Sequence, residues 1–283
     1  MSDNWQGRVW GRTNCSFNED GTRSANGQPA ACGTGDCFGV LNCVTTVCIT
    51  GSLECCHACA MKSKTNKKQG ATPVTLFEIA LKAGSDNTQS FYDISLVDGY
   101  NLPMGIQYIG GGEGLDLPPN LTNCACVASV NQPVAASDMA GNSSFPVPRT
   151  DVPPGDLSRW CPWDHQLDPP TKPGDGVYPY PDDDIKRPDF SPCLSECAKT
   201  NSEEACCAGK YNDPKVCKPG MYATQAKVVC PDAYSFAFDD QQSTFIVPSG
   251  GGWEIAFCPG VGSTNIIKTF PKELADLGQG RLH

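Results

Sequence analysis

Histidine is scarce in this sequence, and no long apolar segment occurs in it. Only three of the 283 residues are histidines: His57, His165 and His283. Mixed metal sites combine cysteine with histidine, so this shortage disfavours metal binding as the purpose of most of the cysteines. No apolar stretch approaches the roughly 20 residues that a membrane-spanning helix needs. We therefore expect no resident metal or other cofactor and no insertion into a membrane.

Positive charge is also in short supply. The chain has 21 Lys and Arg residues against 31 Asp and Glu, which gives a formal net charge of −10. The basic residues cluster only between positions 62 and 68. Nucleic acid and anionic membrane surfaces attract basic proteins, so this balance disfavours both as partners. A neutral or cationic ligand suits this negative net charge better than an anionic one.

Cysteine, in contrast, is abundant, with 18 residues. A chain of this length can bury a sizeable core without cross-links. Cysteines at this density are unusual in reducing compartments, so we expect disulfides and a secreted, extracellular protein. No signal peptide follows Met1, and we expect that the natural start of the chain is missing. For four cysteines near His57, a zinc knuckle is the alternative to disulfide bonding. These are Cys48, Cys55, Cys56 and Cys59.

Short segments rich in β-branched and aromatic residues alternate with turns, because Gly (29) and Pro (24) are frequent. This pattern predicts the strands of an all-β sandwich or barrel. The expected strands are residues 8–10, 91–97, 243–247 and 253–257. One helix is predicted over residues 76–83, where Thr75 and Glu78 form a capping box and Gly84 supplies the stop. Residues 127–192 are rich in proline and predict an irregular region, and residues 260–283 predict a tail.

Several long sequence strings resemble those of the thaumatin-like protein family (pathogenesis-related group 5, or osmotin type). They are spread from residue 7 to residue 259, which leaves chance a poor explanation. The strings are Gly7–Cys15 (GRVWGRTNC), Thr34–Cys37 (TGDC), Phe91–Met104 (FYDISLVDGYNLPM), Cys230–Phe236 (CPDAYSF) and Phe257–Pro259 (FCP).

The resemblance implies a flattened two-sheet β-sandwich with disulfide-rich loop regions. Residues 1–123, which include a Cys-rich loop at 15–70, and residues 227–259 would form the sandwich core. Residues 124–226 would form the irregular, Pro-rich and disulfide-rich region. The family domain opens with strands that precede the string containing Arg8, and we expect this chain to lack them.

The resemblance also implies a disulfide pattern, which spacing alone cannot provide. The implied pairs are Cys15–Cys32, Cys37–Cys43, Cys126–Cys230, Cys161–Cys193, Cys197–Cys206 and Cys207–Cys217. Six cysteines are left without an assigned partner. These are Cys48, Cys55, Cys56, Cys59, Cys124 and Cys258.

Family members with an acidic cleft use one arginine and four carboxylates. The residues at the matching positions are Arg8, Glu78, Asp93, Asp98 and Asp232. Glycoside hydrolysis needs one protonated carboxyl group and one ionised carboxylate, and crowded carboxylates beside a guanidinium can supply both. We assign Glu78 as the general acid and Asp93 as the general base, and the opposite assignment stays open. The other three residues would bind substrate.

Each of these residues also has a plain structural interpretation. Glu78 could serve only the capping box. Asp93 and Asp98 are five residues apart, so in a regular strand they would face opposite sides unless the chain turns near Gly99. Asp232 follows a proline, where aspartate often caps backbone amides.

Together the resemblance and the carboxylates predict a monomeric endo-β-1,3-glucanase that acts on the polysaccharide of fungal-type cell walls. The alternative is a non-catalytic, glucan-binding protein of the antifungal defence type. A third possibility is an inert fragment that lacks essential strands. Family resemblance alone cannot separate these, because function resides in the site and not in the fold.

Overall fold

The computed structural model describes most of the chain. The described residues are 4–24, 30–37, 39, 41, 71–110, 116–130, 139, 141–142, 144–169 and 191–281. The expectations for Cys43, Cys48, Cys55, Cys56 and Cys59, including the zinc alternative, lie outside these residues.

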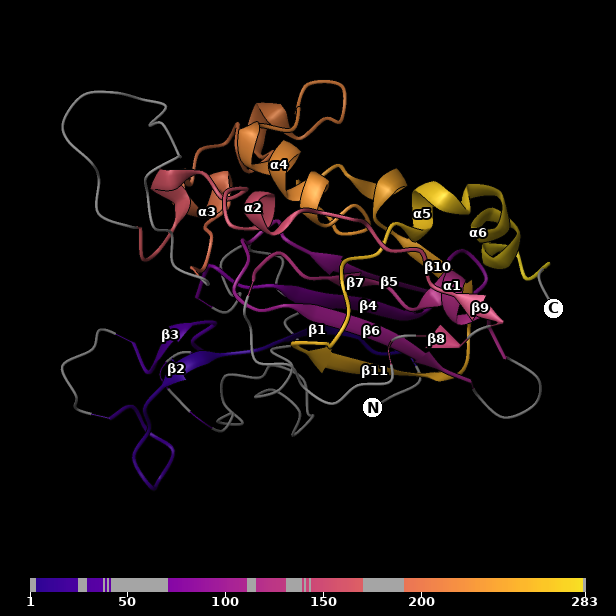
Figure 1. Cartoon of the computed structure of the whole chain (residues 1–283), viewed down its shortest axis with the longest axis horizontal. Coiled ribbons are helices and arrows are strands. Elements are labelled where there is room, and N and C mark those ends of the chain that lie inside the picture. Colours follow the sequence, from indigo (N-terminus) through magenta and orange to yellow (C-terminus); the bar gives the residue numbers. More distant parts are fainter. Residues whose placement is uncertain are drawn as a thin grey trace.

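Two antiparallel sheets form the centre of the molecule (Figure 1). The larger sheet has the order β1 (Gln6–Trp10), β4 (Leu76–Ala83), β5 (Gln89–Ser95) and β10 (Phe245–Pro248). The smaller has the order β11 (Gly252–Phe257), β6 (Met104–Ile109) and β7 (Ala125–Cys126). The predicted all-β sandwich with disulfide-rich loops is confirmed.

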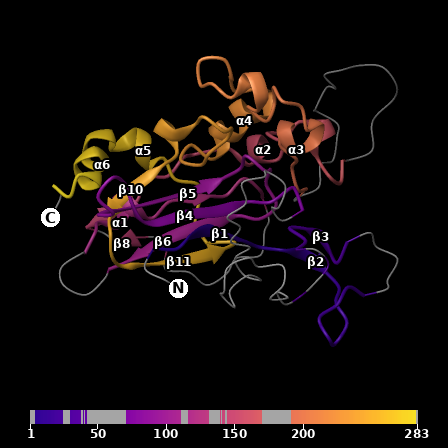
Figure 2. The ribbon, with the colours of Figure 1, turned by 180° about the vertical axis from the view of Figure 1, so that it is seen from behind.

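Shorter elements surround the two sheets. Two small hairpins consist of β2 (Thr13–Cys15) with β3 (Cys32–Thr34), and β8 (Gly141–Asn142) with β9 (Phe145–Pro146). The helices are α1 (Pro119–Thr122), α2 (Pro154–Leu157), α3 (Glu196–Thr200), α4 (Met221–Val229), α5 (Ile266–Thr269) and α6 (Pro271–Gly278). Three short 3₁₀ turns cover Trp163–His165, Gly209–Tyr211 and Asp240–Gln242. Helices α2 to α6 lie on one side of the sheets, and β2–β3 extends away from them (Figures 1 and 2).

The alternation of side chains along β5 separates the core from the site. Tyr92 and Ile94 are buried, and Tyr92 stacks on Phe245 of β10 with ring centroids 5.3 Å apart. Trp253 of the smaller sheet meets Tyr92 edge-on, so the rings join the two sheets. Because successive side chains in a strand point to opposite faces, Asp93 faces away from this aromatic cluster.

The helix predicted over residues 76–83 is wrong, because these residues form the central strand β4. Thr75 does not cap a helix; its hydroxyl accepts hydrogen bonds from the backbone N–H groups of Asn101 (3.1 Å) and Leu102 (3.3 Å). Strand β4 has strands on both sides, and this pairing outweighs the local helical signal of an eight-residue segment.

Among the described residues, five of the six implied disulfides are present, and the sixth includes Cys43, which lies outside them. The five are Cys15–Cys32, Cys126–Cys230, Cys161–Cys193, Cys197–Cys206 and Cys207–Cys217. Cys37 is also disulfide-bonded. Cys124 and Cys258 are free thiols, as their lack of an assigned partner suggested.

The segment after Pro259 is packed onto the sandwich. Helix α6 packs against β10, and Ile266 and Leu277 are fully buried in the main core. The expected tail is therefore, over its described residues, part of the folded body.

Candidate functional site

Three of the predicted site residues lie in one row across neighbouring strands. Arg8 of β1 lies directly opposite Glu78 of β4, and Glu78 lies directly opposite Asp93 of β5. Directly opposed residues in antiparallel strands have Cβ atoms about 4.5–5.5 Å apart, so their side chains touch. The Arg8 Nε–H group donates a hydrogen bond to Glu78 Oε1. The sheet register therefore places a guanidinium and two carboxyl groups side by side.

The two carboxyl groups occupy different environments. Burial, reinforced by the charge of Glu78, raises the pKa of Asp93 well above its usual value, and Arg8 only partly opposes this. The Asp93 Oδ1 atom is buried and has no hydrogen-bond partner in the described part of the chain. The Glu78 side chain is 26% exposed and is ion-paired with Arg8. Burial therefore favours the protonated form of the Asp93 carboxyl group, which lies beside a carboxyl group that is ion-paired with Arg8.

Asp98 joins this group because the chain turns after β5 ends at Ser95. Gly99 has φ +102°, and a Cβ atom there would lie 2.4 Å from the Cys193 carbonyl oxygen, so the turn requires glycine. Burial raises the pKa of Asp98 to about 6, while Arg8 lowers it and Glu78 raises it. These interactions place Asp98 within electrostatic reach of the row of three residues.

The structure does not bring Asp232 into this cluster. Its Oδ2 atom accepts a hydrogen bond from the Ile266 N–H group (2.8 Å), and its Oδ1 atom accepts one from Ile267 (3.0 Å). Both amides belong to the first turn of α5, and the first N–H groups of a helix have no carbonyl partner within the helix. Asp232 therefore fixes α5 to the sandwich, which is the capping role that its position after Pro231 suggested.

Asp240 lies near Asp93 and was not singled out from the sequence. The negative charge of Asp240 contributes to the raised pKa of Asp93, and its Oδ1 atom accepts a hydrogen bond from the Tyr234 hydroxyl (2.9 Å). Tyr234 is held beside β5, where it donates to the Ile94 carbonyl and accepts from the Leu96 amide, both at 2.8 Å. The adjacent acids Asp239 and Asp240, shortly after the CPDAYSF string, were the available signal.

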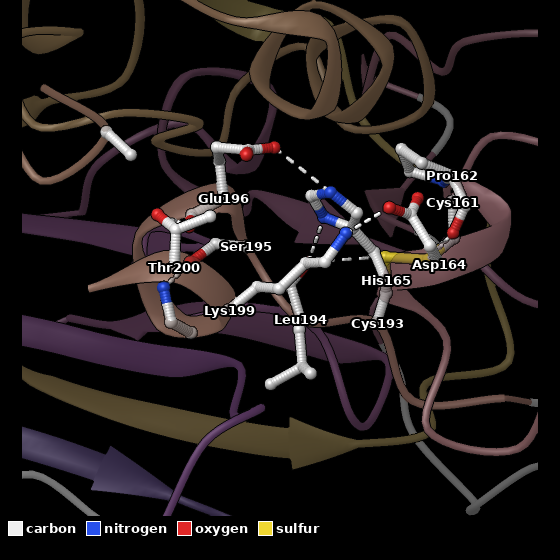
Figure 3. A network of polar contacts seen from close by, with 12 residues as sticks. Cys161, Pro162, Asp164, His165, Cys193, Leu194, Ser195, Glu196, Lys199 and Thr200 are labelled. Atoms are coloured by element: carbon white, nitrogen blue, oxygen red, sulfur yellow. Dashed lines mark hydrogen bonds and ion pairs between the residues drawn. A yellow bond between two sulfur atoms is a disulfide. The ribbon is translucent and has the colours of Figure 1, made fainter. Parts of the chain in front are cut away.

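A second polar network surrounds His165 (Figure 3). The buried ring of His165 has its Nε2 atom 3.0 Å from Glu196 Oε2 and its Nδ1 atom 2.8 Å from the Leu194 carbonyl oxygen. The ring stacks on Tyr222, and the charge of Asp98 raises the pKa of that tyrosine in addition to the effect of burial. Tyr222 thus connects the disulfide-rich region with the acidic cluster.

The described residues contain no group of three or more His, Cys, Asp or Glu side chains that could hold a metal ion. Among the helices of these residues, none combines the length and the apolar character needed to cross a bilayer.

Comparison with known proteins identifies the family. A model of the Thaumatin family matches residues 1–53 and 45–259, so the chain belongs to the thaumatin family. It is 32% identical over 258 residues to thaumatin-like protein 1 of Arabidopsis thaliana, covering 90% of this chain and 68% of that relative. It is 31% identical to pathogenesis-related thaumatin-like protein 3.5 of Cryptomeria japonica, covering 91% and 72% of the two chains.

The name of one of the relatives states a glucanase activity. The chain is 29% identical to a Prunus avium protein named glucan endo-1,3-beta-glucosidase, over 90% of this chain and 72% of that relative. Other relatives are named only as thaumatin-like or pathogenesis-related proteins. Membership of the family therefore fits both enzymes and proteins with no stated activity.

Proposed function

We propose that this protein is a secreted endo-β-1,3-glucanase whose catalytic groups are Glu78 and Asp93. The observation that carries the proposal is the direct cross-strand pairing of these two carboxyl groups next to Arg8. Pairs of titratable groups whose environments separate their pKa values are a common basis for acid–base catalysis. The name of the Prunus avium relative supports β-1,3-glucan as the substrate.

The environments favour Asp93 as the general acid and Glu78 as the base or nucleophile, which reverses the assignment made from the sequence. Burial keeps the Asp93 proton in place, so this residue can protonate the oxygen of the leaving sugar. Glu78, which contacts the Arg8 guanidinium, attacks the anomeric carbon or removes a proton from the attacking water. Water is added across the broken C–O bond, and Asp98 and Asp240 contribute negative charge around the developing oxocarbenium ion.

The disulfides and the net charge support the remaining parts of this proposal. Five disulfides in the described residues need an oxidising compartment, which supports secretion. A net charge of −10 suits a neutral polysaccharide better than nucleic acid or an anionic membrane. We propose that the protein acts as a monomer on fungal-type cell walls.

The alternative is a glucan-binding defence protein without turnover. One observation favours it: the Asp93 Oδ1 atom is buried, so a sugar must displace the surrounding groups to reach that oxygen. The same cluster could then bind glucan hydroxyl groups without breaking a bond.

Release of reducing sugar from linear β-1,3-glucan by the oxidatively folded protein tests the proposal. Glu78→Gln and Asp93→Asn should each lower the rate by about 10²–10⁴-fold, the usual contribution of a general acid or base. Glu254→Gln, an exposed carboxylate on β11, is the matched control and should keep full activity. Circular dichroism checks that each variant is folded. Glucan binding without sugar release would favour the alternative, and unchanged activity in both variants would refute the assignment.

A further inference from the structure

A groove with a volume of about 870 Å³ lies next to the turn that carries Tyr234 and Asp240. Its walls come from α4, α5 and the residues of this turn. The apolar side chains that line it include Val228, Phe236 and Ile267. Val228 is 61% exposed. The groove therefore presents apolar surface to solvent.

The charged groups at the base of the groove neutralise one another. The Lys227 Nζ atom lies 3.0 Å from Asp239 Oδ2 and also donates to the Gln242 carbonyl oxygen (2.9 Å) and the Ser243 hydroxyl (2.7 Å). Asp239 Oδ2 also accepts from the backbone and hydroxyl of Ser235. These contacts hold the turn against α4. Because the two charges neutralise one another, they offer little net charge to an ionic ligand, and Lys268 adds one positive charge to the lining.

Uncharged polar groups surround the apolar walls. The amides of Gln241, Gln242 and Asn265 line the groove. The Asn265 Oδ1 atom is buried and has no hydrogen-bond partner among the described residues, so a ligand hydroxyl that displaces its neighbours could supply the missing donor. Apolar faces combined with amide groups suit a sugar ring, which has a C–H face and a rim of hydroxyls. The groove volume falls in the range of about 300–1,000 Å³ that is typical of ligand sites.

One segment of chain has residues both in the lining of the groove and beside the proposed active site. In residues 234–242, Tyr234 and Asp240 lie beside Asp93, whereas Phe236, Gln241 and Gln242 line the groove. We propose that the groove binds further sugar units of a β-1,3-glucan chain whose reacting bond lies at Glu78 and Asp93. This inference rests on the proposed function and extends it, because it makes binding depend on the length of the glucan.

Isothermal titration calorimetry of the full chain with short and long β-1,3-gluco-oligosaccharides tests this inference. Val228→Glu places a charge against the apolar wall, and Gln241→Ala removes an amide; both residues are exposed, so the fold should be retained. Val228→Glu should weaken binding of the long ligand about tenfold, which corresponds to about 1.4 kcal/mol. Gln241→Ala should also weaken binding of the long ligand. Neither variant should change binding of the short ligand. Met221→Glu, on the same helix but outside the groove lining, is the control and should bind both ligands like the wild type.

The possible results separate the two proposals. Groove variants that bind both ligands normally, or that lose affinity for both equally, would overturn the role of the groove. Binding of the short ligand by the wild-type protein would still support the acidic site. A wild-type protein that binds neither ligand would overturn the proposed function and the inference with it.

Discussion

At the scale of single residues, Asp93 has the surroundings that matter most. Its carboxyl group is buried between Glu78 and the charge of Asp240, and its Oδ1 atom has no hydrogen-bond partner in the described part of the chain. Ionising such a group costs free energy, and the neighbouring groups offset this cost only in part. Proteins retain such costly groups at the expense of stability where a function needs them.

This burial makes the stability of the protein depend on pH. Folded Asp93 holds its proton more tightly than the unfolded chain does, so the free energy of unfolding falls as the pH rises above about 4 and through the raised pKa. Asp93→Asn cannot ionise and should be more stable than the wild type at neutral pH by on the order of 1–2 kcal/mol. Urea unfolding across a pH series measures this, and a difference that does not vary with pH would contradict it.

Arg8 should set the ionisation of its neighbours. Its positive charge lowers the pKa of both Asp93 and Asp98. Arg8→Gln should therefore shift the titration of Asp98, now near pH 6, to higher pH, as observed by carbon NMR of the carboxyl group. Arg281→Gln, whose partner is Asp276 in α6, is the control and should leave that titration in place. An unchanged Asp98 titration in Arg8→Gln would exclude the arginine from the cluster.

At the scale of elements, strand β4 organises the site. It lies between β1 and β5, so one residue of β4 faces both the arginine and the buried aspartate. The turn at Gly99 then returns the chain toward the same face. Helix α5 depends on a different carboxylate, Asp232, which receives two of its first amides.

Loss of Asp232 should damage α5 without abolishing chemistry at the acidic pair. Asp232→Ala leaves the N–H groups of Ile266 and Ile267 without this acceptor, which should cost about 2–6 kcal/mol of stability because each unsatisfied buried group costs about 1–3 kcal/mol. Chemical denaturation measures the loss, and hydrogen exchange at Ile266 and Ile267 locates it. Unchanged exchange at these amides would show that Asp232 does not hold the helix.

At the scale of the whole molecule, disulfides connect segments that are far apart in the sequence. Cys126–Cys230 spans 104 residues and is buried in the core, whereas Cys197–Cys206 spans nine. A cross-link that closes a longer loop removes more conformational freedom from the unfolded chain. The long-range disulfide therefore connects the irregular region to the sandwich.

The two disulfides should differ in their effect on stability. Replacing both cysteines of the Cys126–Cys230 pair with alanine should cost about 4.7 kcal/mol, against about 2.7 kcal/mol for the Cys197–Cys206 pair, by loop entropy alone. Thermal and urea unfolding of the two double variants measure this order. Equal losses would show that loop length does not control their contribution.

The sequence by itself determined the strands around Arg8, Asp93, Phe245 and Trp253, because alternation and turn residues are local properties of the chain. It also supplied the members of the acidic row, since Arg8 and Asp93 lie in long strings typical of the family and Glu78 stands at a position that the resemblance matched. The disulfide pairs in the described residues followed from the same resemblance, although spacing alone left them open.

Only the tertiary structure decided the rest. Residues 76–83 became a strand because neighbours on both sides supplied hydrogen bonds that a local propensity cannot anticipate. Asp240 lies in the acidic cluster and Asp232 does not, because the tertiary structure places the turn at residues 234–242 against β5. The separate environments of Glu78 and Asp93 also arise only there, since burial and the proximity of charges are properties of packed chains and not of sequence order.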